Sequence, residues 1–198
     1  MCYNEQCSVW RFAMNKTLTS REAILSAGKE IIVQSGMEGL NMRDVAHKCG
    51  VSVGSVYNYF PSKSDLIIAT IESVWTEIMH DSKSCVSQHN FSESVLSLFN
   101  RVQKGCEKYP SFFSVHSISV ANLDKDKGRE VMNRYFAHIK NGLLESLNHD
   151  QGIRKDAFSN QFTKEDFIDF IFSNIITLLM KEANSCHFLL EIVKRTIY

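Results

Sequence analysis

The chain has 198 residues, which is enough for one sizeable hydrophobic core or two small ones. Its 22 Lys and Arg residues balance 22 Asp and Glu residues, so it lacks the overall basic charge that many nucleic-acid-binding domains carry. It contains only 9 Gly and 2 Pro and no alternating Val/Thr runs, which argues against a β architecture and favours an all-α fold.

The six cysteines form no CxxC pair and no Cys/His group with the spacing of zinc ligands, and the sequence has no nucleophile, phosphate-loop or metal motif. We therefore expect no metal, no cofactor and no enzymatic activity. The N-terminus lacks the apolar segment of a secretory signal, and no apolar run is long enough to cross a membrane. These features predict a cytoplasmic protein without a membrane partner, in which the cysteines are free thiols.

Residues 1–16 show no periodic apolar pattern and are expected to form a disordered or loosely packed tail; the sequence leaves open whether Met14 is the natural start. Thr19 or Ser20 caps the first long helix, which the pattern predicts to run to about Ser35. The core-facing stripe of this helix is Ala23, Ile24, Ala27, Ile31 and Ile32.

Two short helices joined by a tight turn are predicted next. Asn41 caps the first of them, and Asp44 lies in its positive first turn. Gly50 follows where the end of a helix needs a left-handed residue. Ser52 then caps a second helix, predicted over about 53–60. This arrangement is a helix-turn-helix.

The second of these helices presents an unusual outward face. If Val51, Val56 and Phe60 are buried, the residues left facing mostly outward are Val53, Gly54, Ser55, Tyr57, Asn58 and Tyr59. A narrow face rich in hydrogen-bonding groups suits a DNA groove. This helix has no Arg, so it cannot make a bidentate guanine contact, and Arg43 is the best remaining candidate for a base contact.

The rest of the chain is predicted to be helical. A linking helix over 63–84 leads to helices over about 91–106, 111–121, 129–147, 163–184 and 185–197, with a charged turn over 122–128 and a mobile loop over 148–162. The last two helices are apolar on nearly all sides. One face can fill the chain's own core, and we expect a second copy to cover the other, giving a homodimer through residues of about 163–197.

The ordered segments Gly-Leu-Asn-Met-Arg-Asp-Val-Ala, Cys-Gly-Val-Ser-Val-Gly-Ser-Val-Tyr-Asn-Tyr-Phe and Ser-Lys-Ser-Asp-Leu resemble the tetracycline-repressor (TetR/AcrR) family of transcriptional regulators over roughly Arg21 to Ile78. The resemblance implies an N-terminal three-helix DNA-binding domain (17–62), a linking helix (63–84) and a C-terminal helical domain (85–198) for effector binding and dimerisation.

The resemblance also implies roles for single residues. Arg43 matches a basic position that often touches DNA, and Tyr57 and Lys63 match positions that commonly hold phosphate. Physical chemistry supports these roles, because a Tyr hydroxyl can donate to a phosphate and a helix N-terminus favours an anion beside Lys63. Tyr59 stands where many members have His, and it is an equally good candidate to cover the edge of the core at Phe60. The predicted DNA-binding set is Asn41, Arg43, Val53, Gly54, Ser55, Tyr57, Asn58, Tyr59 and Lys63.

The C-terminal domain offers a weaker set of candidates. Aromatic and polarisable side chains that could line an effector cavity between helices are Cys106, Phe112, Phe113, His116, Tyr135, Phe136 and Phe172. Each of them is also an ordinary core residue by type.

The sequence thus predicts a homodimeric repressor that binds a near-palindromic operator in double-stranded DNA and is released by a small, mainly apolar effector. The alternative is a DNA-binding interaction protein that recruits a protein partner and has no small-molecule effector. The sequence does not distinguish a repressor from an activator.

Overall fold

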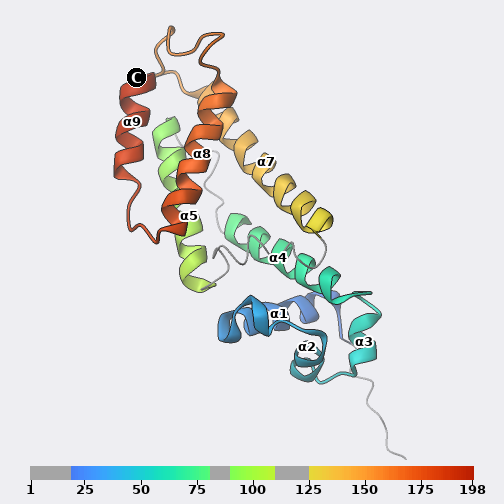
Figure 1. The fold of residues 1–198 in the computed structure, drawn as a ribbon. Helices are drawn as coiled ribbons and strands as arrows, with labels where there is room; N and C mark the ends of the chain where they lie inside the picture. The colour runs from blue at the N-terminus through green and yellow to red at the C-terminus, as the bar shows by residue number, and fades with distance from the viewer. Residues whose placement is uncertain (1–18, 81–89, 110–124) are drawn as a thin grey trace, which may run out of the picture.

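The computed structural model describes residues 19–80, 90–109 and 125–198. Within these ranges the fold is all-α, as predicted, and the only β-bridge joins Ser159 and Phe162. The helices are α1 (Arg21–Ser35), the 3-10 turn η1 (Met37–Gly39), α2 (Met42–Lys48), α3 (Val53–Tyr57), α4 (Lys63–His80), α5 (Phe91–Lys108), α7 (Lys125–His149), α8 (Lys164–Met180) and α9 (His187–Ile197) (Figure 1). None of these helices is long and apolar enough to cross a membrane.

The helices α1, α2 and α3 form a small N-terminal unit, which we call the head (Figure 1). The head is held together by side chains with no exposed surface, and these are Ile24, Ile32, Leu40, Val45 and Val56. Ser20 caps α1, since its hydroxyl accepts from the Ala23 amide at 3.1 Å. Ala23 itself is exposed, so the prediction that it belongs to the core-facing stripe was wrong.

The C-terminal domain is built around α5, which packs against α4, α7, α8 and α9. The helix α4 starts beside the head, packs against α1 and ends against α5 and α7, so it connects the two parts (Figure 1). Its buried residues are Leu66, Ile67, Ala69, Thr70, Val74, Trp75 and Ile78. The predicted linking helix is therefore present, and its last expected positions, 81–84, lie outside the described residues.

Two boundaries in the C-terminal domain differ clearly from the sequence predictions. Residues 125–128 belong to α7, so the predicted charged turn was wrong for them. A run of charges is compatible with the first turn of a helix, and charge alone did not mark a break. The helix α8 ends at Met180, four residues early, where the chain turns and Glu182 takes a positive φ of 53°. The predicted tail over 1–16 and helix over 111–121 lie outside the described residues.

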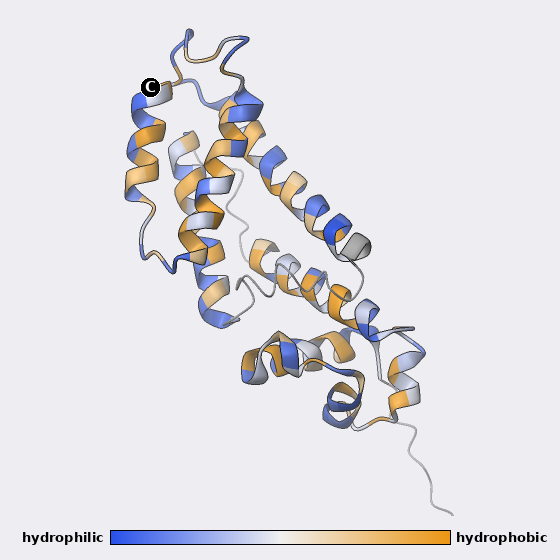
Figure 2. Ribbon diagram, viewed as in Figure 1, coloured by the Kyte–Doolittle hydropathy of each residue, from blue (hydrophilic) through white to orange (hydrophobic). Residues whose placement is uncertain are grey.

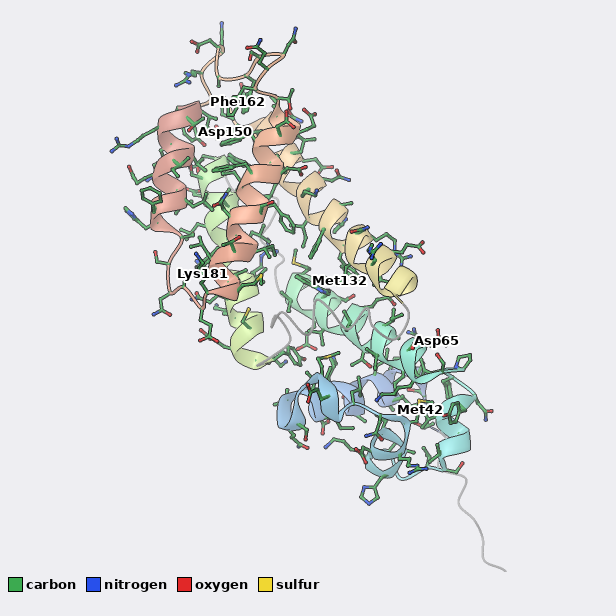
Figure 3. The ribbon with its side chains drawn as sticks, viewed as in Figure 1. Met42, Asp65, Met132, Asp150, Phe162 and Lys181 are labelled. Carbon is green, nitrogen blue, oxygen red and sulfur yellow. The ribbon has the colours of Figure 1, made fainter. Side chains whose placement is uncertain are left out.

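The segment before α8, predicted to be a mobile loop, is held by defined contacts at the end of the molecule opposite the head (Figure 3). The Asp150 carboxylate accepts from the Phe91 amide at 2.7 Å and from the Tyr198 hydroxyl, so it joins the start of α5 to the C-terminus of α9. Phe158 and Phe162 stack with their ring centroids 5.7 Å apart. The Asp150 contacts therefore attach this segment to the start of α5 and to the C-terminus of α9.

The closest approach between α4 and α5 depends on a glycine. A Cβ atom added to Gly105 would lie 2.6 Å from Cδ1 and 2.7 Å from Cγ1 of Ile78, and the β-branched Ile78 is buried and has little freedom to move. We expect Gly105→Ala to lower the free energy of unfolding by about 1–2 kcal/mol, because the overpacking exceeds the gain in helix propensity. Chemical denaturation measures this change.

A matched control is Gly142→Ala on α7, where a Cβ would meet nothing within 4 Å. We expect this change to raise the free energy of unfolding by up to about 1 kcal/mol, because only the propensity term remains. Equal effects of the two substitutions would contradict the close approach at Gly105.

Candidate nucleic-acid interface and effector site

The helix-turn-helix geometry arises from three local features that the sequence predicted. Asn41 caps α2, because its side-chain oxygen accepts from the amides of Arg43 and Asp44, both at 3.0 Å. Gly50 has a φ of 66° in the turn, a conformation that costs glycine nothing. Ser52 caps α3 by accepting from the Ser55 amide at 3.1 Å.

The Asn41 side chain has little hydrogen-bonding capacity left for DNA. Its amide nitrogen donates to the Gly39 carbonyl at 3.1 Å and to the Asp44 carboxylate at 2.6 Å, while its oxygen already accepts two bonds. An asparagine amide offers two donors and two acceptor sites. Asn41 therefore positions the start of α2, which carries the exposed Arg43.

The outward face of α3 is narrower than predicted. Gly54, Tyr57 and Asn58 are exposed, and Tyr57 retains 48% of its surface. Val53 is half-buried and packs against the core, so its predicted outward position was wrong. Ser55 is also half-buried, and its hydroxyl lies 2.9 Å from that of Ser52.

The helix α3 is also shorter than predicted, because it ends at Tyr57 rather than near Phe60. The amides of Tyr59 and Phe60 both donate to the Val56 carbonyl, at 3.0 Å each, and the Tyr59 bond has the i→i+3 spacing of a tighter turn. Phe60 lies in the core, where it is 2% exposed.

Tyr59 is partly committed to the fold. Its hydroxyl donates to the Thr19 carbonyl at 2.6 Å and so joins the end of the helix-turn-helix to the residues that precede α1. The Arg21 guanidinium lies over the neighbouring Phe60 ring, 5.3 Å from its centroid. Sequence reasoning did not find this link, because the two segments are 40 residues apart.

The segment that carries the exposed face of α3 contains basic residues and no acidic ones. The segment 45–64 contains no Asp or Glu, while it carries Lys48 and Lys63. Lys63 is the first residue of α4 and is exposed. The start of α4 is fixed by Ser62, whose hydroxyl accepts from the Asp65 amide at 3.1 Å and donates to the Asp65 carboxylate at 2.7 Å. Lys63 can therefore meet a phosphate, while the nearby Asp65 carboxylate accepts from the Ser62 hydroxyl.

Three residues of the predicted effector set meet in one aromatic cluster in the C-terminal domain. Trp75 of α4 stacks on Tyr135 with the ring centroids 6.3 Å apart, and it meets the Phe136 ring edge-on at 6.0 Å. Phe136 in turn contacts Phe172 of α8 at 5.1 Å. Trp75, which lies at the centre of this cluster, was not in the predicted effector set.

The Tyr135 hydroxyl ties the cluster to α4. It lies 3.0 Å from the Thr76 hydroxyl and donates to the Glu72 carbonyl at 3.2 Å. The neighbouring Arg134 pairs with the Glu72 carboxylate at 3.1 Å. Any molecule that displaced Tyr135 would therefore also disturb the contact between α7 and α4.

The remaining predicted effector residues are less informative. Cys106 lies half-buried on α5, and burial raises the pKa of its thiol to about 11, so the thiol stays protonated and unreactive near neutral pH. Phe112, Phe113 and His116 lie outside the described residues. Among the residues that are described, no group of His, Cys, Asp or Glu could hold a metal ion.

In comparisons with known proteins, the head matches a family model. Residues 24–70 match the model of the tetR family of bacterial regulatory proteins. The chain is 24% identical over 130 residues to the HTH-type transcriptional regulator BetI of Agrobacterium fabrum, covering 65% of this chain and 63% of BetI. It is 38% identical over 58 residues to the HTH-type transcriptional repressor KstR of Mycobacterium tuberculosis, covering 29% of this chain and 26% of KstR. These matches span less than two thirds of either relative.

Solved structures share the fold over most of the chain. A transcriptional regulator from Rhodococcus sp. RHA1 aligns with a TM-score of 0.64 at 16% identity, covering 86% of this chain and 87% of that one. FadR of Bacillus subtilis, solved in complex with stearoyl-CoA, aligns with a TM-score of 0.58 at 17% identity, covering 90% of this chain and 100% of that one. The matched head and the relatives support the tetR family of bacterial regulatory proteins, and the solved structures show that the chain shares their fold.

Proposed function

We propose that this protein is a homodimeric transcriptional repressor that binds a near-palindromic operator through its two heads and is released by a small, mainly apolar effector. The observation that carries the proposal is the exposed end of the helix-turn-helix, where Gly54, Tyr57 and Asn58 face outward between Arg43 and Lys63 in a segment of low negative charge. Such a face suits the major groove, with phosphates on either side.

Within this proposal the predicted DNA-binding residues divide into two groups. Arg43, Gly54, Tyr57, Asn58 and Lys63 contact DNA, with Tyr57 and Lys63 on phosphates and Ser55 at the edge of the groove. The others hold the geometry, and these are Asn41, Val53 and Tyr59. Affinity for each half-site is modest, because α3 has no Arg, and the dimer raises it by engaging two half-sites at once.

The effector site of the proposal is the aromatic cluster around Trp75. Its rings come from α4, α7 and α8, so a bound molecule would contact the helix that leads to the head. The aromatic rings of this cluster favour an apolar effector. FadR, which has the same fold, was solved with stearoyl-CoA, a molecule with a long apolar chain. The effector acts by binding more tightly to a conformation whose heads do not match the operator.

The dimer surface of the proposal is an exposed strip on α8 together with the exposed Phe188 of α9, and we call it the α8–α9 face. The α8 strip consists of Phe170, Ser173, Thr177 and Met180, at helical spacing. The Thr177 hydroxyl donates to the Ser173 carbonyl at 2.8 Å, so its polar group is satisfied within α8 and the strip can pack against another helix. Figure 2 shows hydrophobic residues over much of both helices.

Removing single hydroxyls from Tyr57 and Tyr59 tests the DNA-binding part. We expect Tyr57→Phe to weaken operator binding about 10-fold or more, because a hydrogen bond to a charged phosphate is lost in each head. The free energy of unfolding should change by less than about 0.5 kcal/mol, since the ring is exposed. A mobility shift on DNA flanking the gene, together with chemical denaturation, measures both quantities.

The matched variant Tyr59→Phe should behave in the opposite way. Its hydroxyl bonds to Thr19, so we expect a loss of about 0.5–1.5 kcal/mol in the free energy of unfolding and a change in operator affinity of less than about 3-fold. If Tyr59→Phe weakens binding more than Tyr57→Phe does, the assignment of the DNA-contacting face is wrong.

A further inference from the structure

One carboxylate joins three helices at the point where the head meets the C-terminal domain. Glu77 lies near the end of α4. Its Oε2 atom pairs with the Lys29 ammonium of α1 at 2.5 Å. Its Oε1 atom accepts from the Lys108 ammonium and, at 3.0 Å, from the hydroxyl of Tyr109, both at the end of α5.

The environment of Glu77 favours its charged form. Burial alone would raise the pKa of the carboxyl, but the hydrogen bonds from Lys108, Lys29 and Tyr109 outweigh it and lower the pKa to about 2. Tyr109 is buried, and its own pKa is raised to about 12 by burial and by Glu77. Glu77 therefore stays charged throughout the neutral range, so its contacts are fixed and do not form a pH switch.

Close backbone approaches flank this carboxylate on both sides. On the side of the head, a Cβ on Gly28 of α1 would lie 3.0 Å from the hydroxyl oxygen of the buried Thr70. On the side of the C-terminal domain, a Cβ on Gly105 of α5 would lie 2.6 Å from Cδ1 of Ile78 on α4. The helix α4 is therefore packed tightly against both neighbours, and Glu77 adds the polar contacts that fix how α1 and α5 are placed along it.

We propose that Glu77, with Lys29, Lys108 and Tyr109, is a brace that fixes the direction of the head relative to the C-terminal domain and so sets the distance between the two heads of the dimer. This inference rests on the proposed function, because it assumes a dimer that reads two half-sites. The helix α1 has no other ion pair with α4 or α5 among the residues described. Without the brace, the head is held mainly by the packing of α1 against α4, which permits small rotations.

Half-site spacing is the property that reports on such a brace. Each inserted base pair moves one half-site by about 3.4 Å and rotates it by about a tenth of a turn. A rigid pair of heads tolerates little of this change, whereas loosely held heads adapt to it. A variant that was merely less stable would lose affinity for every spacing in equal proportion, so the two causes are separable.

The experiment uses the full-length protein and an operator selected from random DNA, with zero, one or two base pairs inserted between the half-sites. We expect wild-type affinity to fall at least about 10-fold at two inserted base pairs, and the affinity of Glu77→Gln to fall less than about 3-fold. Lys29→Gln should flatten the spacing dependence in the same way, because it removes the contact of Glu77 with α1 and leaves its contacts with Lys108 and Tyr109.

The matched control is Glu30→Gln. Glu30 pairs with Lys48 at 2.9 Å inside the head, so the change removes one negative charge and one ion pair without touching the brace. We expect this variant to keep the spacing dependence of the wild type. The inference is overturned if Glu77→Gln and Lys29→Gln retain that dependence, or if Glu30→Gln loses it to the same degree.

A second measurement tests the brace without DNA. Nitroxide labels attached through non-natural side chains at exposed Ser26 of α1 and Glu145 of α7 give the distance between head and C-terminal domain, in dimers with one labelled chain. We expect one narrow distribution for the wild type and Glu30→Gln, and a broader one for Glu77→Gln. An equally narrow distribution in Glu77→Gln overturns the brace, whereas a wild type that binds no selected DNA overturns the proposed function.

Discussion

Replacing Phe188 with aspartate should convert the protein from a dimer to a monomer. Phe188 is 79% exposed in the single chain, more than any other large hydrophobic residue of the described parts. In a two-fold interface each substitution occurs twice, so two carboxylates must lose water in an apolar contact. We expect the dissociation constant of the dimer to rise about 100-fold or more. Light scattering at micromolar concentration measures the change in mass.

The single-chain fold should tolerate this substitution. Because Phe188 is exposed, the intrinsic stability of the monomer should change by less than about 0.5 kcal/mol. Val33→Asp is the matched control, since Val33 is also apolar and 47% exposed but lies on α1. Val33→Asp should leave the protein dimeric, with the mass of two chains. A dimer that persists in Phe188→Asp at wild-type affinity would place the interface elsewhere.

Loss of the dimer should have a large effect on operator binding. Two linked heads bind the second half-site at an effective concentration near the millimolar range, which can raise affinity by about 10²–10⁴-fold over one head. The monomeric variant should therefore shift operator DNA only at concentrations where a single half-site is also shifted. If operator affinity survives in a proven monomer, one head is sufficient and the dimeric part of the proposal is wrong.

The features that could be predicted from sequence are those set by neighbouring residues. The caps at Asn41 and Ser52 and the left-handed Gly50 each depend on a few adjacent positions, and all three are present. A cap of the same local kind starts α8, where the Thr163 hydroxyl accepts from the Asp166 amide. Together these signals were enough to place the helix-turn-helix and the order of the helices.

The features that could not be predicted depend on residues far apart in the chain. The Tyr59 bond to Thr19, the Trp75 cluster and the Glu77 brace each join different helices. Helical periodicity says which face is apolar, but it does not say which residue of another helix that face meets. Val53 shows the same limit, because only the packing of the head decides that it is half-buried.

Lys63→Ala should reduce both the affinity for the operator and its dependence on salt. A lysine that neutralises one phosphate releases about 0.9 counterions, so losing it from both heads should lower the slope of log K against log salt by about 2. At low salt the affinity should fall about 10–100-fold, and by a similar factor for all DNA sequences, because a phosphate carries no sequence information. Titrations at several salt concentrations give the slope.

The control is Lys155→Ala, which removes the same charge from the loop before α8, at the opposite end of the molecule from the head (Figure 1). It should leave the slope unchanged within about 0.3, because long-range charge is screened beyond roughly a Debye length. An equal change of slope in both variants would mean that net charge, and not a contact at Lys63, governs binding.

The position of Lys63 helps to separate binding from stability. A positive charge in the first turn of α4 lies at the positive end of the helix dipole, so it opposes folding by about 0.3–1 kcal/mol. Lys63→Ala should therefore leave the free energy of unfolding unchanged or raise it slightly. Weaker operator binding in a protein of equal or greater stability cannot come from a damaged fold, and it would assign Lys63 to the DNA contact itself.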